Sequence, residues 1–382
     1  MRRALLLCCS LLLPGVLLPA QRALTATEAF RISAADEDLS VVSSVAVSDR
    51  GVIAVGQPQD HRIIFFDRTG QRLEAFGRDG EGPGEFRTMI LVGWFGDTLA
   101  VQDSRTSRIT RVFPDRKLLR TTPFVLQMLP PGGSDGSAPI QARVYVHGEQ
   151  ANGNQVASIG QYPNTTPPKW LAHDNTQVAP WVVLRPDGRV VRRLGDHART
   201  PECLVSWSSG QSSGGAFVPW CAQGYADASP GGGFAGFVTP RRPGAYGVTL
   251  VDAMRGDTLF SISYTYRPVP VTKQQADSIR EQRARGPSIP GQSSAFWRDM
   301  PVAEHFPGLS RFLVGRDGSV WLREFDMIPR FERWHIFNRR GEPLGVVALE
   351  GQVSVLEVYA DHFWGTMADD DGLQDVVEWR LR

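Results

Sequence analysis

The residue types that most often do chemistry are scattered along this chain. Its seven histidines stand at positions 61, 147, 173, 197, 305, 335 and 362, and no two have the spacing that places metal ligands on one helix face. Asp369-Asp370-Asp371-Gly372 resembles part of a calcium-binding loop, but it lacks the alternating ligands and the distal Glu, so a hairpin turn is the better interpretation. We therefore predict no cofactor and no metal ligands, although a metal ion such as calcium could still be held by residues from separate repeats.

A serine-centred motif is also incomplete. Residues 210–214 read Gly-Gln-Ser-Ser-Gly, which matches the letters of a nucleophile elbow. That elbow needs a strand before the serine and a helix after it, whereas the flanks here are Ser, Gly and a strand-like run from Ala216. The sequence predicts no catalytic residue, and an enzyme is the less favoured class.

The N-terminus has the three parts of a secretory signal peptide. Met1-Arg2-Arg3 is basic, Ala4 to Leu13 is apolar, and Leu18-Pro19-Ala20 ends in a small residue. Pro14 interrupts the apolar run too early for a membrane-spanning helix, which needs roughly 20 apolar residues. We expect residues 1–20 to be removed and the mature protein, without a transmembrane segment, to be periplasmic or extracellular.

Export bears on the cysteines. Only Cys203 and Cys221 lie outside the expected signal peptide, and in an oxidising compartment an isolated pair is interpreted first as a disulfide. It would close a loop rich in Ser and Gly. The alternative, a metal or nucleophilic pair, lacks ligand spacing nearby.

Composition favours short strands and argues against nucleic acid. The 382 residues include 39 Gly and 27 Pro, which indicate many turns, and 42% are hydrophobic, which is ample for a core. Basic and acidic residues nearly balance, with a net charge of +1, whereas a phosphate-binding surface needs a basic excess.

One pattern recurs along the chain, a strand, a glycine- or charge-rich turn, and a second strand. The turns lie at Asp67–Gly70, Pro114–Lys117, Pro186–Gly188, Met254–Asp257 and Asn338–Gly341. β-branched and aromatic residues flank each turn, and glycine supplies the positive φ that such turns need. Two further candidate strands precede each hairpin, for example Ser40–Val47 and Gly51–Val55 before the first. Four-stranded antiparallel units repeated in this way predict a β-propeller.

The two ends of the chain complete the count of blades. The last unit, from Val353 to Leu381, has only three strands, and Ala29–Ile32 is the expected fourth. This pairing would close the ring and remove an exposed edge. We thus predict an all-β protein with a single six-bladed propeller domain over residues 27–382. Insertions are expected near 130–139, 163–180 and 270–298, the last with a surface helix capped by Thr272.

A glycine-rich segment follows the first hairpin, Phe76-Gly77-Arg78-Asp79-Gly80-Glu81-Gly82-Pro83-Gly84-Glu85-Phe86. It resembles the linker of NHL-type six-bladed β-propellers, and the C-terminal third is similar to exported bacterial members of that group. This resemblance implies the fold. It implies little about function, because such propellers serve as scaffolds, sensors, lactonases and lyases.

Topology predicts where a site would lie. In each blade, the loop between the second and third strands and the linker to the next blade emerge on the same face. The loops expected there are 57–61, 77–85, 102–105 and 323–330. We expect this mouth to bind a ligand through Arg78, Glu85, Asp103, Arg105 and Arg330.

Two functions lead from the sequence, and a membrane-attached sensor part is a third possibility that requires the N-terminus to be retained or lipidated. The first is a binding or protein-interaction module, most simply a monomer, whose partner is a protein, a peptide or a carbohydrate. The alternative is a metal-assisted hydrolase or lyase, lactonase-like, with carboxylate, Asn or His ligands converging in the central channel. Whether such side chains meet there separates the two.

Overall fold

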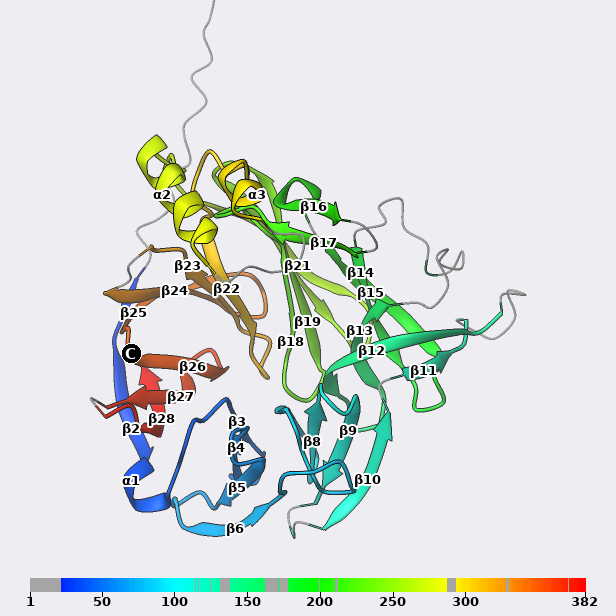
Figure 1. Ribbon diagram of the computed structural model, residues 1–382. Helices are drawn as coiled ribbons and strands as arrows, with labels where there is room; N and C mark the ends of the chain where they lie inside the picture. Colours follow the sequence, from blue (N-terminus) through cyan, green and yellow to red (C-terminus); the bar gives the residue numbers. More distant parts are fainter. Residues whose placement is uncertain are drawn as a thin grey trace, which may run out of the picture.

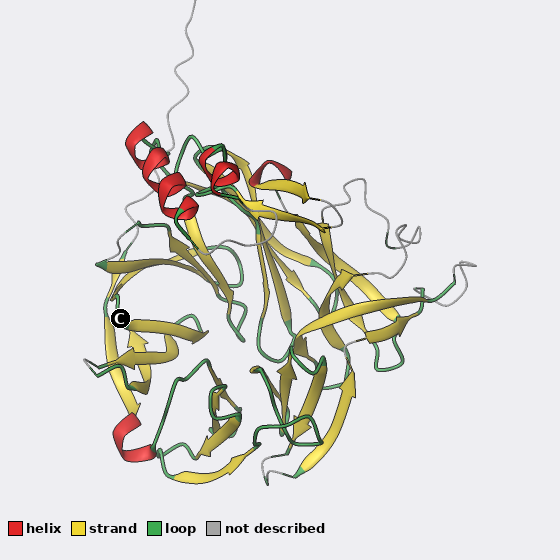
Figure 2. Ribbon diagram, viewed as in Figure 1, coloured by secondary structure: helices red, strands yellow, loops and turns green. Residues whose placement is uncertain are grey.

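The computed structural model describes residues 22–382 except 114, 116, 124, 131–137, 162–170, 172–177, 199, 210–211, 287–292, 328–329 and 370. The expected signal peptide, residues 1–20, lies outside the described residues. The described part of the chain is an all-β ring of six blades, each built on four antiparallel strands (Figures 1 and 2). This confirms the predicted six-bladed propeller.

The first three blades follow one another along the chain. Blade 1 contains β3 (Ser44–Val47), β4 (Ile53–Gln57), β5 (Arg62–Phe66) and β6 (Arg72–Phe76). Blade 2 contains β7 (Met89–Phe95), β8 (Thr98–Asp103), β9 (Arg108–Val112) and β10 (Leu118–Pro123). Blade 3 contains β12 (Ile140–Glu149), β13 (Gln155–Gln161), β14 (Val178–Leu184) and β15 (Val190–Ala198), with β11 (Val125–Met128) paired to the start of β12.

The other three blades complete the circle. Blade 4 contains β18 (Tyr225–Ala228), β19 (Phe234–Arg242), β20 (Ala245–Asp252) and β21 (Thr258–Thr265). Blade 5 contains β22 (Leu309–Val314), β23 (Val320–Glu324), β24 (Phe331–Phe337) and β25 (Pro343–Glu350). Blade 6 contains β26 (Val353–Val358), β27 (His362–Ala368), β28 (Gln374–Leu381) and, from the N-terminus, β2 (Ala26–Ile32).

The recurring hairpins are the third and fourth strands of blades 1 to 5. In blade 1, for example, Ile64 pairs with Ala75 across β5 and β6. Their turns use glycine as predicted: Gly70 has φ 84° and Gly341 has φ 78°, a region that other residues rarely adopt.

Both ends of the chain close the ring. Strand β2 pairs antiparallel with β28, so that Ile32 lies opposite Val376, which confirms the predicted closure (Figure 1). The structure adds a contact that the sequence did not predict. Strand β1 (Ala23–Leu24) pairs in parallel with β25 of blade 5, so one N-terminal segment joins two blades.

The blades are held together by apolar packing and by hydrogen bonds from one blade to the next. Between blades 1 and 2, Phe65 and Trp94 are fully buried with their rings 6.1 Å apart, and the Trp94 indole donates to the Ala46 carbonyl at 3.0 Å. Between blades 2 and 3, the buried Arg111 and Glu149 form an ion pair at 2.9 Å. The Trp94 indole and the Arg111 and Glu149 side chains are thus buried with partners.

Two additions to the ring lie between blades 3 and 5. The first is the hairpin of β16 (Leu204–Ser209) and β17 (Ser212–Phe217), which follows a 3-10 helix at Pro201–Cys203. Cys203 and Cys221 form the predicted disulfide across this hairpin. The second is the linker from blade 4 to blade 5, with helices α2 (Lys273–Ala284) and α3 (Ser294–Arg298), which lie together at one side of the ring (Figure 2).

Helix α2 is the surface helix expected from the sequence. Thr272 caps it, and the Gln275 side chain returns the contact to the Thr272 main chain, a capping box. A further short helix, α1 (Ala34–Glu37), follows β2. Of the helices in the described part of the chain, none could span a membrane. The predicted insertions near 130–139 and 163–180 fall mainly outside the described residues.

Candidate functional site

Four of the five residues predicted to bind a ligand gather around the linker between blades 1 and 2. Arg78 and Glu85 form an ion pair at 2.7 Å within this linker. Glu85 also accepts the Gly82 main-chain N–H, and this bond, followed by the Arg78 side chain, lowers the pKa of the Glu85 carboxyl. The charges of Arg78 and Glu85 are therefore already paired with each other within the linker.

Asp103 organises the same linker from within. It is only 1% exposed, and its carboxylate accepts main-chain N–H groups from Arg87, Thr88, Arg105 and Thr106 at 2.7–3.3 Å. Each of these bonds is internal, so Asp103 positions the loop. The Arg105 side chain is exposed on the surface.

Arg330 lies apart from these four, on blade 5. Its guanidinium stacks over the Phe331 ring, 5.4 Å from the ring centre, and it lines a cavity in that blade. The structure therefore does not unite the five predicted residues in one site.

A first cavity, of about 340 Å³, lies in the central channel. Its walls come from the innermost strands of blades 2 to 6, and His147, Asp227 and Glu357 are its ionisable residues. Titratable groups do converge on the channel, as the enzyme hypothesis requires.

Each ionisable channel residue already has partners in neighbouring strands. Asp227 accepts the Val314 N–H of the next blade at 2.8 Å, and Glu357 accepts the Val47 N–H at 3.0 Å. His147 lies 2.8 Å from the Ser158 hydroxyl.

Burial sets the charge of these groups. It raises the pKa of Asp227 to about 6 and also raises the pKa of Glu357, while it lowers the pKa of His147 to about 4. His147 is therefore neutral at pH 7. Within the described residues, no group of three or more His, Cys, Asp or Glu is arranged to hold a metal ion.

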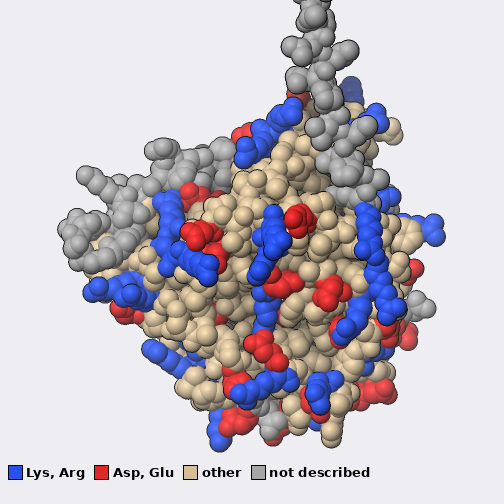
Figure 3. Space-filling view, turned by 180° about the vertical axis from the view of Figure 1, so that it is seen from behind, with Lys and Arg blue, Asp and Glu red and all other residues tan. Residues whose placement is uncertain are grey.

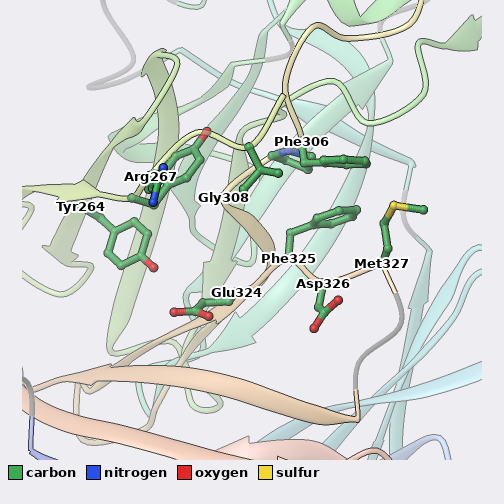
Figure 4. Close-up of a pocket in the computed structure, with 11 residues that line it drawn as sticks. Tyr264, Arg267, Phe306, Gly308, Glu324, Phe325, Asp326 and Met327 are labelled. Carbon is green, nitrogen blue, oxygen red and sulfur yellow. The ribbon is translucent and has the colours of Figure 1, made fainter. Parts of the chain in front are cut away.

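A second cavity, of about 420 Å³, lies between blades 4 and 5, and we call it the aromatic cavity. Its lining comes from the end of β21, the blade 4–5 linker and the loop after β23: Tyr264, Tyr266, Arg267, Val269, Phe306, Pro307, Gly308, Glu324, Phe325, Asp326 and Met327. Figure 4 shows Phe306 and Phe325 one above the other, with Tyr264 across from them and Glu324 and Asp326 along one side. The volume is in the range of small-ligand sites.

The aromatic wall is rigidly supported. Phe306 and Phe325 stack with ring centres 5.7 Å apart, and Trp220, next to the disulfide, contacts Phe306 at 5.0 Å. The Phe325 N–H donates to the Gly308 carbonyl at 3.1 Å, which ties the loop to the linker. Gly308 is required here, because a Cβ at this position would lie 2.4 Å from the Tyr266 ring.

Hydrogen bonds set the charges of the aromatic cavity. Glu324 lies 2.6 Å from His335, and this contact lowers the pKa of the Glu324 carboxyl. Burial, followed by the nearby Glu324 charge, raises the pKa of Tyr264, so its hydroxyl remains protonated and able to donate.

A third cavity, of about 260 Å³, adjoins the aromatic cavity, and we call it the polar cavity. It shares Glu324, Phe325 and Asp326 with the aromatic cavity and adds charged side chains of β23, β24 and the loop between them, which gives the lining Arg323, Glu324, Phe325, Asp326, Arg330, Phe331, Glu332 and Arg333. An apolar and a charged compartment thus lie side by side on one loop. That loop, 323–330, was expected at the mouth of the ring.

Sequence reasoning missed the aromatic residues of this site. Tyr264, Phe306 and Phe325 stand far apart in the chain, and each looks like ordinary core material on its own. The available signal was the predicted mouth loop, which contains Glu324, Phe325 and Arg330; only Arg330 was selected from it.

Comparisons with known proteins place the chain in no family. No protein-family model matches it, and no curated protein matches it. Among solved structures, it is similar to a "putative exported protein" from Bacteroides fragilis, with 10% identity over 94% of this chain and 95% of that chain and a TM-score of 0.47. It is also similar to a member of the DUF4221 family from Bacteroides vulgatus, with 8% identity over 95% and 99% of the two chains and a TM-score of 0.49.

A third similar structure is regucalcin, a calcium-binding protein from Agrobacterium tumefaciens, with 9% identity over 93% and 96% of the two chains and a TM-score of 0.38. Similarities at this level assign neither a family nor an activity to this chain.

Proposed function

We propose that this protein is an exported binding module of the NHL type, a monomer without a cofactor, which captures a segment of a partner polypeptide in the cavities between blades 4 and 5. The observation that carries the proposal is the aromatic cavity adjoining the polar cavity along Glu324–Asp326. An apolar compartment with a few polar groups beside it is the usual composition of a binding site. The proposal keeps Arg330 as a ligand-binding residue and moves the centre of the site away from Arg78, Glu85, Asp103 and Arg105.

The charge distribution agrees with a peptide or protein ligand and not with nucleic acid. On the face in Figure 3, basic and acidic side chains alternate, and neither sign forms a continuous patch. The formal net charge of +1 leaves no large basic excess to bind a phosphate backbone.

The proposal is tested by removing the aromatic wall. Peptides that bind the mature protein are selected from a displayed random library. The affinity of the enriched peptides is then measured for the unchanged protein and for Phe325→Ala. Loss of a buried aromatic contact of this kind costs on the order of 2 kcal/mol, so binding should weaken at least ten-fold.

The matched control is Phe113→Ala, because Phe113 is a partly exposed Phe at the end of β9 on blade 2. It should bind like the unchanged protein. Equal affinity of the Phe325→Ala variant, in a protein with an unchanged melting temperature, would rule out this cavity as the site.

A metal-assisted hydrolase or lyase in the channel is the second candidate, and His147, Asp227 and Glu357 are the residues that favour it. It has less support, because the two carboxylates already accept main-chain N–H groups from the adjacent blade. Metal content of the protein purified without chelators tests it: one bound cation per chain, lost in Asp227→Asn or Glu357→Gln, would favour the enzyme.

A further inference from the structure

The aromatic and polar cavities differ in which of their charges are already satisfied, and this difference identifies the ligand that fits them. It rests on the proposed function, because it concerns the same two cavities. The acidic residues there have partners: Glu324 lies 2.6 Å from His335, Glu332 lies 2.7 Å from Arg323, and Asp326 also has an interaction partner. Each of these acidic side chains thus already has an interaction partner within the protein.

The arginines at the same place are less satisfied. Within the described residues, neither Arg267 in the aromatic cavity nor Arg330 in the polar cavity has a carboxylate within 4.0 Å. Arg333 reaches Glu324 only at 3.9 Å and is 65% exposed. The unmatched charge of the two cavities is thus positive, which complements an anionic group on the ligand.

Arg330 also has donors that are open to such a group. Its guanidinium lies over the Phe331 ring at 5.4 Å, a cation–π contact that leaves the edge of the guanidinium and its N–H donors available. A planar guanidinium suits a carboxylate, whose two oxygens it can contact together.

Because the two cavities adjoin each other, only some carboxylates of a peptide ligand could reach Arg330 while an aromatic side chain of the same peptide fills the aromatic cavity. The cavities share a wall, so the apolar group and the anionic group of the ligand must be close neighbours. In an extended peptide, successive side chains point to opposite faces, so an acidic side chain next to an aromatic one would point away. In a C-terminal aromatic residue, ring and carboxylate branch from the same Cα atom.

We propose that the ligand is the C-terminus of a polypeptide ending in an aromatic residue, with the ring in the aromatic cavity beside Phe306 and Phe325 and the terminal carboxylate on Arg330. Capture of a C-terminal carboxylate is an established mode of peptide recognition. Arg267, which lines the aromatic cavity, would add positive charge there.

The test uses four short peptides and the mature protein, with affinities from isothermal titration. The first ends in Phe with a free carboxylate, and the second is its C-terminal amide. The third is an amide with Asp two residues before the Phe, and the fourth is an amide with Lys at that place. We expect the free carboxylate to bind about five-fold more tightly than its amide, since an ion pair with an exposed arginine contributes up to roughly 1 kcal/mol.

Variants assign the preference to its residue. Arg330→Gln should remove the difference between the acid and the amide, while Arg340→Gln, an exposed arginine in the turn between β24 and β25, should preserve it. Equal binding of acid and amide, or tightest binding of the Asp or the Lys peptide, would overturn the assignment of a C-terminal carboxylate while leaving the peptide-binding function in place. No binding of any of the four, together with no enriched peptide from the library, would overturn both.

Discussion

At the scale of single residues, two carboxylates that line the channel connect neighbouring blades by hydrogen bonds. Asp227 on blade 4 accepts a main-chain N–H from blade 5, and Glu357 on blade 6 accepts one from blade 1. Ser44 does the same with its hydroxyl, which accepts the Leu91 N–H of blade 2 at 3.2 Å. The Ser44 hydroxyl carries no charge, so its burial avoids the free-energy cost of removing a charge from water. Burial of the ionised Asp227 carboxylate incurs that cost.

Asp227 therefore makes stability depend on pH. Because burial raises its pKa from 3.8 to about 6, the folded protein holds the proton more tightly than the unfolded chain. The contribution of Asp227 to the free energy of unfolding is fully present below pH 4 and is lost as pH rises through 6, on the order of 3 kcal/mol. Asp227→Asn keeps an acceptor for Val314 and does not ionise.

We expect the free energy of unfolding of Asp227→Asn, relative to the unchanged protein, to rise between pH 4 and pH 7.5. Urea denaturation at several pH values measures this. Ser44→Ala is the control, because a hydroxyl does not titrate, and its effect should be the same at each pH. A constant difference for Asp227→Asn would mean that its carboxyl titrates as it does in the unfolded chain.

At the scale of elements, the disulfide hairpin supports the aromatic cavity. Trp220 is the residue before Cys221, and its ring contacts Phe306. Phe306 in turn stacks on Phe325. The Ala303 N–H of the blade 4–5 linker also donates to the Pro219 carbonyl at 3.2 Å. The cavity wall therefore depends on a segment that the disulfide holds in place.

Replacing both Cys203 and Cys221 with Ser should lower the free energy of unfolding by about 3 kcal/mol, as expected for a loop whose ends are separated by 18 positions in the sequence. It should also increase amide hydrogen exchange at Phe306 and Gly308, which mass spectrometry detects. Exchange that rises only within β16 and β17 would show that the hairpin and the cavity are independent.

Gly308 lies in the blade 4–5 linker and lines the aromatic cavity. Gly308→Ala places a methyl group against the Tyr266 ring at 2.4 Å, so either the ring or the linker must move. We expect weaker peptide binding with only a small change in melting temperature. Gly286→Ala is the comparison, since its nearest neighbour would be at 3.2 Å and it lies after α2, away from the cavity. Unchanged affinity in Gly308→Ala would mean that the cavity adapts.

At the scale of the whole molecule, the N-terminal segment joins blades 5 and 6 and closes the circle. β2 supplies the outer strand of blade 6, and its Arg31 forms ion pairs with Glu28 and with Asp375 in β28. β1 adds only two paired residues to blade 5.

Two truncations separate these contributions. A protein beginning at residue 26 loses β1 and should remain folded with a moderately lower melting temperature. A protein beginning at residue 33 also loses β2, which exposes the edge of β28, and should unfold or aggregate. Circular dichroism and size-exclusion chromatography measure both. A folded, monomeric protein beginning at residue 33 would show that closure by β2 is dispensable.

Local signals in the sequence were enough to predict the ring. The turns at Gly70 and Gly341 require a positive φ, which favours glycine. The alternating apolar residues on either side suit a pleated, half-buried surface. Both features can be recognised within a segment of about 15 residues. The last unit had only three strands, and Ala29–Ile32 from the N-terminus was the predicted fourth because it would close the ring. The lone cysteine pair outside the signal segment was likewise readable as a disulfide.

The site, in contrast, was decided by the tertiary structure. Tyr264, Phe306 and Phe325 meet only because a linker between blades and a loop within a blade emerge on the same face, and no local pattern marks residues brought together in this way. Asp103 was predicted to bind a ligand, and only the tertiary structure shows that its carboxylate accepts four main-chain N–H groups. Local conformational preferences determine which strands form, whereas the distances between side chains on different blades depend on how those blades pack.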